Sequence, residues 1–373
     1  MNLEYRMNKS FSIYLDLVRF IAACLVYLYH SNQRWLVQDI LPASNYGHSS
    51  VIVFFVLSGY VIAYITDTRE RQFASYAASR LSRVYSVALP AVVLTIALDA
   101  AGRQFFAAPY GYPFDYFLLR AAASLLLLNE VWFVSITSFS NVPYWSICYE
   151  MWYYVAFGMV MFLPRSTGWM AVAVLALLLG PKVVLLAPIW TLGVLLYHWE
   201  RLRALPQPAA WLLLTGSCMG IVLFHQASIT EQTANLFKEL IDEKWYAQFT
   251  FSKFFLSDYL LGVLVFSNFA AMRTLSSHAA PVLLALERPI RFLASFTLSL
   301  YLLHQPLFLF WGAVLRGDPV GYAYWWSTTA LVAASVLVIG SITEGKRHLL
   351  KKWLQQHLLM IETSLRQRYA FAR

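Results

Sequence analysis

Three ionisable side chains interrupt the first long apolar run of the chain, LDLVRFIAACLVYLYH (residues 15–30): Asp16, Arg19 and His30. Arg19 and His30 are eleven residues apart, so a helix places both on one face, about 16 Å apart along its axis. Ionisable groups within an apolar helix are functional candidates by default. The alternative is that Asp16 and Arg19 form an interfacial pair and that His30 is a packing residue.

Two arginines one helical turn apart lie in ASRLSRVYS, residues 78–86. Arg80 and Arg83 share a helix face, and two guanidinium groups held together suit a phosphate group, which accepts paired hydrogen bonds from each of them. Anchoring of a helix end to the cytoplasmic side explains the same pair. The pattern alone leaves both interpretations open.

Two further apolar segments carry polar side chains at helical spacing. In YWSICYEMWYY (144–154), Ser146 and Glu150 share a face, and a carboxylate in such a helix must be protonated or paired. In LSLYLLHQP (298–306), Tyr301 and His304 are one turn apart and Pro306 predicts a kink. A buried structural carboxyl and a packing kink are the alternatives to a functional site.

The composition is that of an all-α membrane protein. The 373 residues are 60% hydrophobic and 13% charged, with a mean hydropathy of +0.57, whereas soluble domains carry about 25% charged residues. The long apolar runs predict helices rather than an outer-membrane barrel. The net charge of +9 comes from short loops and the tail, which favours membrane orientation over nucleic-acid binding. Three cysteines without CxxC spacing indicate neither a disulfide framework nor a metal site.

Eleven apolar windows are candidate spans, at residues 13–36, 49–66, 85–101, 117–136, 144–163, 167–181, 183–198, 209–225, 254–270, 292–315 and 321–342. Basic clusters separate several of them, at 69–83, 201–203, 273–291 and 346–352. Such clusters are expected on the cytoplasmic side.

An even number of crossings must therefore separate Arg83 from Arg201, yet five windows lie between them. Either 117–136 is re-entrant, or 167–198 is one helix kinked around Lys182. We favour the re-entrant segment, because a lysine in mid-bilayer is costly. The sequence then predicts about ten transmembrane helices, both termini cytoplasmic, a transmembrane domain over 1–344 and a basic cytoplasmic tail over 345–373.

Taken together, these motifs resemble the integral-membrane acyltransferase family 3, whose members O-acylate bacterial polysaccharides and other extracytoplasmic glycans. The resemblance covers most of the chain and is carried by five elements in order: Asp16, Arg19 and His30; FFVLSGY (54–60); Arg80 and Arg83; Trp145, Ser146 and Glu150; and Ser299, Tyr301, His304 and Pro306. Ser86 stands where the family often has proline, Phe20 where it often has glycine, and CYEMWYY replaces the commoner VEEQFYY.

The resemblance implies that an acyl group, by default acetyl, passes from cytoplasmic acyl-coenzyme A to a hydroxyl of an extracytoplasmic glycan such as O-antigen or exopolysaccharide. Acyl-coenzyme A is then a co-substrate, with no permanently bound cofactor and no metal. The glycan can be lipid-linked, and membrane lipids are the other expected partner. The expected location is the cytoplasmic (inner) membrane of a bacterium.

The expected site residues follow from the motifs and from the chemistry of each side chain. His30 is the expected base or acyl carrier, with Glu150 orienting it and Arg19 also at the catalytic centre. Arg19, Arg80 and Arg83 are expected to bind the phosphates of coenzyme A. The supporting or substrate-binding residues are Asp16, Trp145, Ser146, Tyr301 and His304. Direct transfer and an acyl-His30 relay both stay open.

Two other classes of protein fit parts of the pattern. A transporter of a small anionic solute or of the acyl donor also has intramembrane charges and kinked helices, although no inverted repeat with paired broken helices is visible. A non-catalytic subunit of an envelope-glycan machine would have no reason to keep Arg19, His30 and Glu150. Release of free coenzyme A in the presence of an acceptor distinguishes the enzyme from both.

Overall fold

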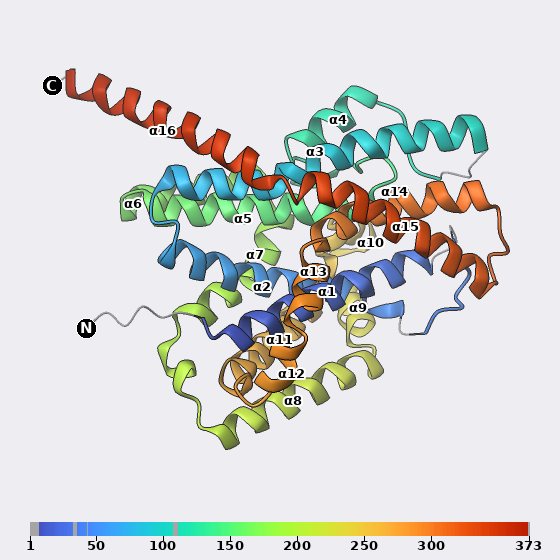
Figure 1. Cartoon of the computed structure of the whole chain (residues 1–373), viewed down its shortest axis with the longest axis horizontal. Helices are drawn as coiled ribbons and strands as arrows, with labels where there is room; N and C mark the ends of the chain where they lie inside the picture. Colours follow the sequence, from blue (N-terminus) through green and yellow to red (C-terminus); the bar gives the residue numbers. More distant parts are fainter. Residues whose placement is uncertain (1–6, 33–35, 43, 107–110, 372–373) are drawn as a thin grey trace.

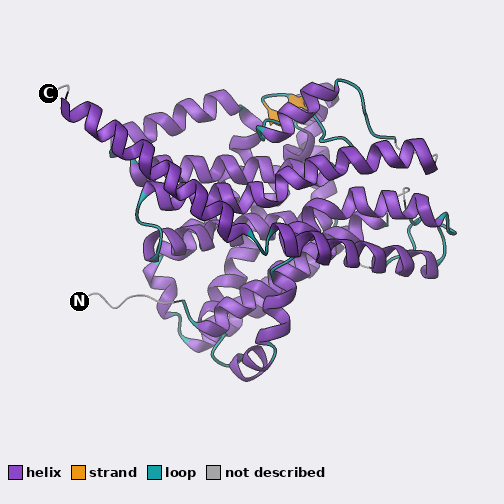
Figure 2. Cartoon of the chain, turned by 45° about the horizontal axis from the view of Figure 1, so that its top comes forward, coloured by secondary structure: helices purple, strands orange, loops and turns teal. Residues whose placement is uncertain are grey.

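The computed structural model describes residues 7–32, 36–42, 44–106 and 111–371. These residues are helical almost throughout, with one small strand pair (Figure 2). Within the described ranges, eight helices are long and apolar enough to cross a membrane. The protein is therefore an all-α membrane protein, as the composition predicts.

The sixteen helices and two strands within the described residues follow one another along the chain. Their bounds are α1 Lys9–Ser31, α2 Gly47–Thr68, α3 Phe73–Phe106, α4 Phe117–Leu125, β1 Glu130–Val131, β2 Val134–Ser135, α5 Trp145–Phe162, α6 Arg165–Leu179, α7 Pro181–His198, α8 Gln207–Gln226, α9 Ile229–Ile241, α10 Glu243–Gln248, α11 Phe255–Leu275, α12 Ala280–Ala285, α13 Glu287–Ala294, α14 Thr297–Leu315, α15 Tyr322–Thr343 and α16 Arg347–Phe371. Short 3₁₀ turns cover Ser44–Tyr46, Val142–Tyr144, Glu200–Ala204 and Thr250–Phe254.

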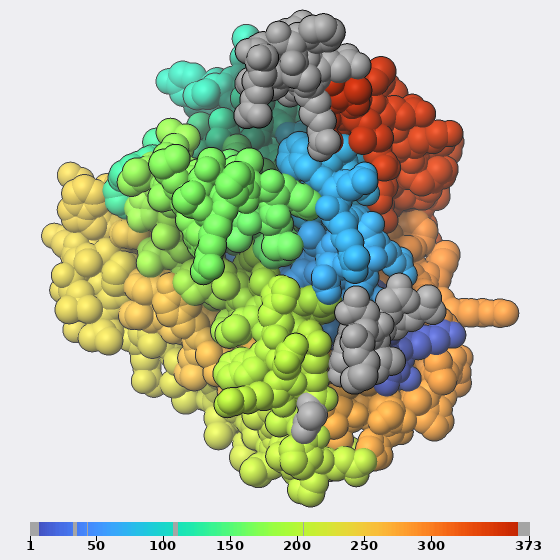
Figure 3. Space-filling model, turned by 90° about the vertical axis from the view of Figure 1, so that its left-hand side faces the viewer, coloured from blue at the N-terminus to red at the C-terminus, as the bar shows by residue number. Residues whose placement is uncertain are grey.

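The long helices lie side by side, and their connections gather at two ends of the bundle (Figure 1). The α2–α3, α5–α6 and α7–α8 connections share the left-hand end with the far end of α16. Figure 3 shows this end of the molecule from outside, with the blue, green, yellow-green and red segments exposed on it. The basic clusters around Arg69 and Arg201 thus come to one end, as the parity argument requires. That this end faces the cytoplasm stays a prediction.

The window at 117–136 does not form a membrane-length helix. It consists of α4, with nine residues, and the antiparallel pair β1–β2, in which Glu130 faces Ser135. A nine-residue helix is only about 13 Å long. The window at 167–198 is two helices, because Gly180 separates α6 from α7 with a φ of +85°, a conformation that favours glycine. The predicted ten spans require α5 (18 residues) and α6 (15 residues) to cross as well.

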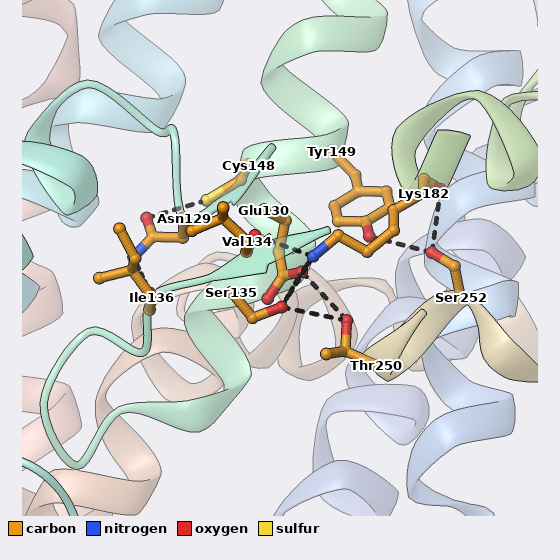
Figure 4. Close-up of polar contacts among 10 residues, drawn as sticks. All are labelled: Asn129, Glu130, Val134, Ser135, Ile136, Cys148, Tyr149, Lys182, Thr250 and Ser252. Carbon is orange, nitrogen blue, oxygen red and sulfur yellow. Dashed lines mark hydrogen bonds and ion pairs between the residues drawn. The ribbon is translucent and has the colours of Figure 1, made fainter. Parts of the chain in front are cut away.

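Lys182 is completely buried at the start of α7, although a buried lysine is costly on its own. Its Nζ forms an ion pair with Glu130 and donates to the carbonyl oxygen of Val134 (2.9 Å) and to Ser135 Oγ (2.7 Å). Thr250 Oγ1 also donates to Glu130, at 3.1 Å. Figure 4 shows these groups meeting between the hairpin and α7. The hairpin thus supplies the carboxylate and the two hydrogen-bond acceptors that offset the cost of burying Lys182, and the sequence alone did not identify them.

The same network positions α5 (Figure 4). Cys148 Sγ contacts Asn129 Oδ1 at 3.2 Å, and the Tyr149 hydroxyl pairs with Ser252 Oγ at 2.9 Å. Ser252 Oγ in turn donates to the carbonyl oxygen of Lys182 at 2.9 Å. The first turn of α5, which carries Ser146, is therefore fixed from the hairpin side.

Helices α2 and α7 approach each other to backbone contact. A Cβ on Gly59 would lie 2.0 Å from the Trp190 carbonyl oxygen, and one on Gly193 would lie 1.9 Å from that of Val56. Larger residues do not fit there without moving a helix. The Ser58–Gly59 pair therefore lies where the two helices approach closely, which fixes the depth of Ser58 in the bundle.

The segment 345–373, expected as a tail, is largely the helix α16. Its beginning lies along α3, where Lys351 reaches Glu70 at 3.4 Å. Its far end projects from the bundle (Figure 1). The first turns of α16 thus belong to the packed protein and carry Arg347 to the end of α15.

Candidate active site: a histidine pair above an arginine-lined cavity

The His30 and His304 side chains are in direct contact. His30 Nδ1 lies 2.8 Å from His304 Nε2, and His304 Nδ1 lies 3.0 Å from the carbonyl oxygen of Leu300. A carbonyl only accepts, so His304 Nδ1 carries a hydrogen. In a neutral His304 the Nε2 atom then accepts from His30 Nδ1–H. This assignment leaves the lone pair on His30 Nε2 available to a substrate.

The pair joins the last turn of α1 to the middle of α14. His304 comes seven residues after Thr297 in a helix of 19 residues, about 10 Å from the start of α14, and its side chain is fully buried. His30 is half-buried. His304, expected only as a supporting residue, is thus the residue that holds the His30 ring.

The backbone of α14 near His304 is held by a residue from before α5. Pro306 has no N–H, so the carbonyl of Leu302 lacks its partner within the helix. Asn141 Nδ2 donates to that carbonyl at 2.7 Å. On the other side, Gln305 Nε2 donates to the Tyr112 hydroxyl at 2.7 Å. Burial raises the pKa of Tyr112 to about 12, so this phenol stays protonated near neutral pH.

Ser146 and Tyr301 also come together. The two hydroxyl oxygens are 2.6 Å apart, one helical turn from His304. Trp145 faces elsewhere: its ring stacks on Phe251 at 4.4 Å with an interplanar angle of 3°. Trp145 is therefore a packing residue of α5, whereas Ser146 and Tyr301 place two hydroxyl groups beside the histidine pair.

Glu150, expected to orient His30, forms no hydrogen bond with it among the described residues, and that role stays a prediction. Among the described residues, its hydrogen bonds come from Ser58 Oγ (2.6 Å) and the Tyr154 hydroxyl. The physical reason is its position on α5, one turn, or about 5.4 Å, beyond Ser146. There it interacts electrostatically with Arg19 and Arg83. The carboxylate has the partners that an apolar helix requires, but they are not the histidines.

A cavity of about 370 Å³ opens beside these arginines, at the start of α14. Four guanidinium groups and two carboxylates line it, on residues Asp16, Arg19, Arg83, Arg291, Glu344 and Arg347. They come from α1, α3, α13 and the junction of α15 with α16. Phosphate groups are the ligands best matched to such a cluster.

Arg80 is not part of this cavity lining. Its guanidinium forms a 2.7 Å ion pair with Glu70 and lies 5.7 Å from the ring centroids of both Tyr76 and Tyr154. Both partners of the ion pair are buried. Although Arg80 and Arg83 are one turn apart, Arg80 forms its ion pair with Glu70, in the α2–α3 connection, and so lies outside the cavity lining. The expectation of a phosphate-binding Arg80 therefore does not match its surroundings.

Polar side chains join the cavity to the histidine pair. Within the described residues, the cavity lining ends at the first turn of α14, below His304. From there, Arg83 contacts Tyr154, which donates to Glu150. Ser146, one turn of α5 away from Glu150, pairs with Tyr301. His304, one turn of α14 after Tyr301, contacts His30. A line of polar side chains thus runs between the cavity and the pair.

Several residues of this site were not identified from the sequence. Ser58 belongs to the FFVLSGY motif of the resemblance, but no role was expected for it. Arg291 belonged to a basic cluster interpreted as orientation, and Glu344 stood at the end of the last apolar window. An acid ending a span beside a basic run is a usable signal. Nothing in the local sequence pointed to Asn141.

Comparison with known proteins gives one match. A family model described as an acyltransferase domain, Acyl_transf_3, matches residues 12–344. The curated proteins and the solved structures yield no match. The matched range contains the histidine pair, Glu150 and all the charged residues of the cavity lining except Arg347. The chain therefore belongs to the acyltransferase family 3.

Proposed function

We propose that this protein transfers an acyl group, by default acetyl, from acyl-coenzyme A on the cytoplasmic side to a hydroxyl of an extracytoplasmic glycan. The observation that carries the proposal is the 2.8 Å contact between His30 Nδ1 and His304 Nε2, with a line of polar side chains leading from the pair towards an arginine-lined cavity. The enzyme works in the inner membrane of a bacterium. O-antigen and exopolysaccharide are acceptors of the right chemistry.

The tautomers of the pair suit base catalysis. A sugar hydroxyl is a poor nucleophile at neutral pH and needs a base. His30 Nε2 takes the hydroxyl proton while Nδ1–H donates more strongly to neutral His304, and the oxygen attacks the thioester carbon. The coenzyme A thiolate leaves and receives a proton from the His30 imidazolium, which restores the neutral pair.

An acyl relay uses the same atoms. His30 Nε2 first attacks the thioester carbon, the C–S bond breaks, and coenzyme A leaves as the thiolate, with the positive charge of the acyl-imidazolium shared by the histidine pair. The glycan hydroxyl then attacks the acyl carbon, the bond to Nε2 breaks and neutral His30 is restored, while the hydroxyl proton passes through solvent to the thiolate. In both routes an oxyanion develops at the carbonyl, and the hydroxyl groups of Ser146 and Tyr301 are its proposed donors.

Glu150 has a positioning role in this proposal. It holds the Tyr154 hydroxyl and Ser58 and lies within electrostatic range of Arg19 and Arg83. It thereby fixes the guanidinium groups between the cavity and the histidine pair. Arg19 contributes to donor binding from the same place.

The test uses purified protein, labelled acetyl-coenzyme A and glycan from the parent cells. Wild type releases coenzyme A and labels the glycan, whereas His30→Ala loses at least about 10²-fold in rate, the lower end for a general base. His225→Ala is a matched control, because this histidine is half-buried on α8 and pairs with Ser49 rather than with the site. Equal rates for His30→Ala and wild type contradict the proposal. Label transport without coenzyme A release supports the transporter instead.

A further inference from the structure

The four arginines of the cavity form two pairs, each around one acidic side chain. Arg19 and Arg291 are the first pair: both donate to Asp16, at 3.0 Å and 2.8 Å. Arg291 also donates to Glu287, at 3.0 Å on the same helix. The first pair thus joins α1 to α13.

Arg83 and Arg347 are the second pair, and both interact electrostatically with Glu344. Glu344 Oε1 also accepts a hydrogen bond from the Ser299 backbone N–H at 2.6 Å. This pair joins α3 to the junction of α15 with α16. Each carboxylate therefore sits with two guanidinium groups, and the two sets come from different elements.

The cavity has a surplus of positive charge. Four arginines and two acids line it, a formal charge of +2 on the lining itself, while Glu287 and Glu150 approach Arg291 and Arg19 from outside the lining. Arg19 Nε is buried and has no hydrogen-bond partner among the described residues, and buried donors without partners are costly. The volume of about 370 Å³ lies within the range of small-molecule sites, about 300–1,000 Å³. An anionic ligand would neutralise the positive charge of the lining.

The geometry points to a site for two separate phosphate groups of one ligand. Arg19 with Arg291 holds one phosphate group, and Arg83 with Arg347 holds the other. The inference rests on the proposed function, since acyl-coenzyme A carries a 5′-diphosphate and a 3′-phosphate on its adenosine. Arg291 and Arg347 lie outside the motifs that carry the family resemblance. They make α13 and the α15–α16 junction part of the donor site.

Coenzyme A and its 3′-dephospho form are the probes that test this assignment. The full chain, purified in detergent, is titrated with each at fixed ionic strength, because salt screens such contacts. Arg291→Gln and Arg347→Gln each weaken coenzyme A binding about tenfold or more, as expected for charge-assisted hydrogen bonds. Arg288→Gln is the matched control: it is exposed on the same helix as Arg291, outside the cavity lining, and changes binding less than about twofold.

The 3′-phosphate distinguishes the two pairs. Wild type binds dephospho-coenzyme A about tenfold more weakly than coenzyme A. The variant that has lost the arginine facing the 3′-phosphate binds both probes equally, whereas the other variant keeps the tenfold preference. Arg291→Lys keeps the charge but not the planar fork, so its affinity falls between wild type and Arg291→Gln. Thermal unfolding without ligand verifies that each variant is folded.

Two results separate this inference from the proposed function. If wild type binds coenzyme A and both glutamine variants match Arg288→Gln, the two-phosphate site is wrong while the proposed function stands. If wild type does not bind coenzyme A, the proposed function fails and this inference fails with it. Equal binding of the two probes by wild type also overturns the assignment of a 3′-phosphate pair.

Discussion

Two buried charged regions of this protein differ in how fully their polar atoms are paired. Around Lys182, every donor of the ammonium group has an acceptor, on Glu130, Val134 and Ser135. In the cavity lining around Arg19, four guanidinium groups stand against two carboxylates, and the buried Arg19 Nε has no hydrogen-bond partner among the described residues. A charge network that is complete by itself stabilises the fold, whereas an incomplete one is suited to a ligand.

The largest effect is expected in the complete network. Lys182→Met leaves the Glu130 carboxylate buried without its cation, which costs about 3–5 kcal/mol of unfolding free energy. Thermal unfolding in detergent measures the loss. Lys182→Met combined with Glu130→Gln recovers much of the stability, because no buried charge is left unpaired. A single variant as stable as wild type would show that the network is not needed for the fold.

The histidine pair gives the next largest effect. His304→Leu removes the acceptor that holds His30 Nδ1–H, so the rate of coenzyme A release falls about 10²-fold, within the range for a general base. The affinity for coenzyme A and the unfolding temperature stay close to those of wild type, since the cavity is untouched. A full rate in a folded His304→Leu protein contradicts the role of the pair.

Replacing Glu150 distinguishes a role in orienting His30 from a role in positioning the arginines of the donor site. A residue that orients a catalytic histidine loses about 10⁴-fold in kcat when its carboxylate becomes an amide. Glu150 contacts Ser58 and Tyr154 instead, so Glu150→Gln is expected to lower kcat less than about tenfold and to act mainly on the KM for acyl-coenzyme A. Steady-state kinetics of the folded variant decide between these outcomes. A loss near 10⁴-fold would restore the orienting role.

The smallest effect is expected at Asn141. Asn141→Leu removes the donor to the Leu302 carbonyl, at a cost of about 1–3 kcal/mol for an unsatisfied buried acceptor. Because that carbonyl lies in the turn of α14 that carries His304, the rate falls as well. Asn141→Asp tests the same contact, since a carboxylate has no N–H to donate. If both variants match wild type in stability, the carbonyl has another donor.

The sequence predicted elements and faces better than it predicted partners. Helical spacing placed His30 and Arg19 on one face, and the charge of Lys182 correctly argued for a break in 167–198. Spacing along one helix cannot say which residue of another helix lies opposite. For this reason His304, 274 residues away in the chain, took the place expected of Glu150.

Charge patterns were similarly incomplete. Arg80 and Arg83 share a sequence motif, but their surroundings differ because Glu70 pairs with only one of them. Lys182 and Glu130, which pair in the structure, are 52 residues apart in the chain. Their contact depends on the β1–β2 hairpin, which the spacing of apolar residues does not predict. These contacts are tertiary, and they follow from packing rather than from local sequence.

The central claim is that an acyl group supplied from the arginine-lined end reaches a glycan hydroxyl through His30. Membrane vesicles with that end facing outward, loaded inside with glycan acceptor, test it most directly when labelled acetyl-coenzyme A is added outside. The account predicts labelled glycan inside and free coenzyme A outside in equal amounts, and neither product with His30→Ala. Labelled glycan formed equally by His30→Ala vesicles would contradict it.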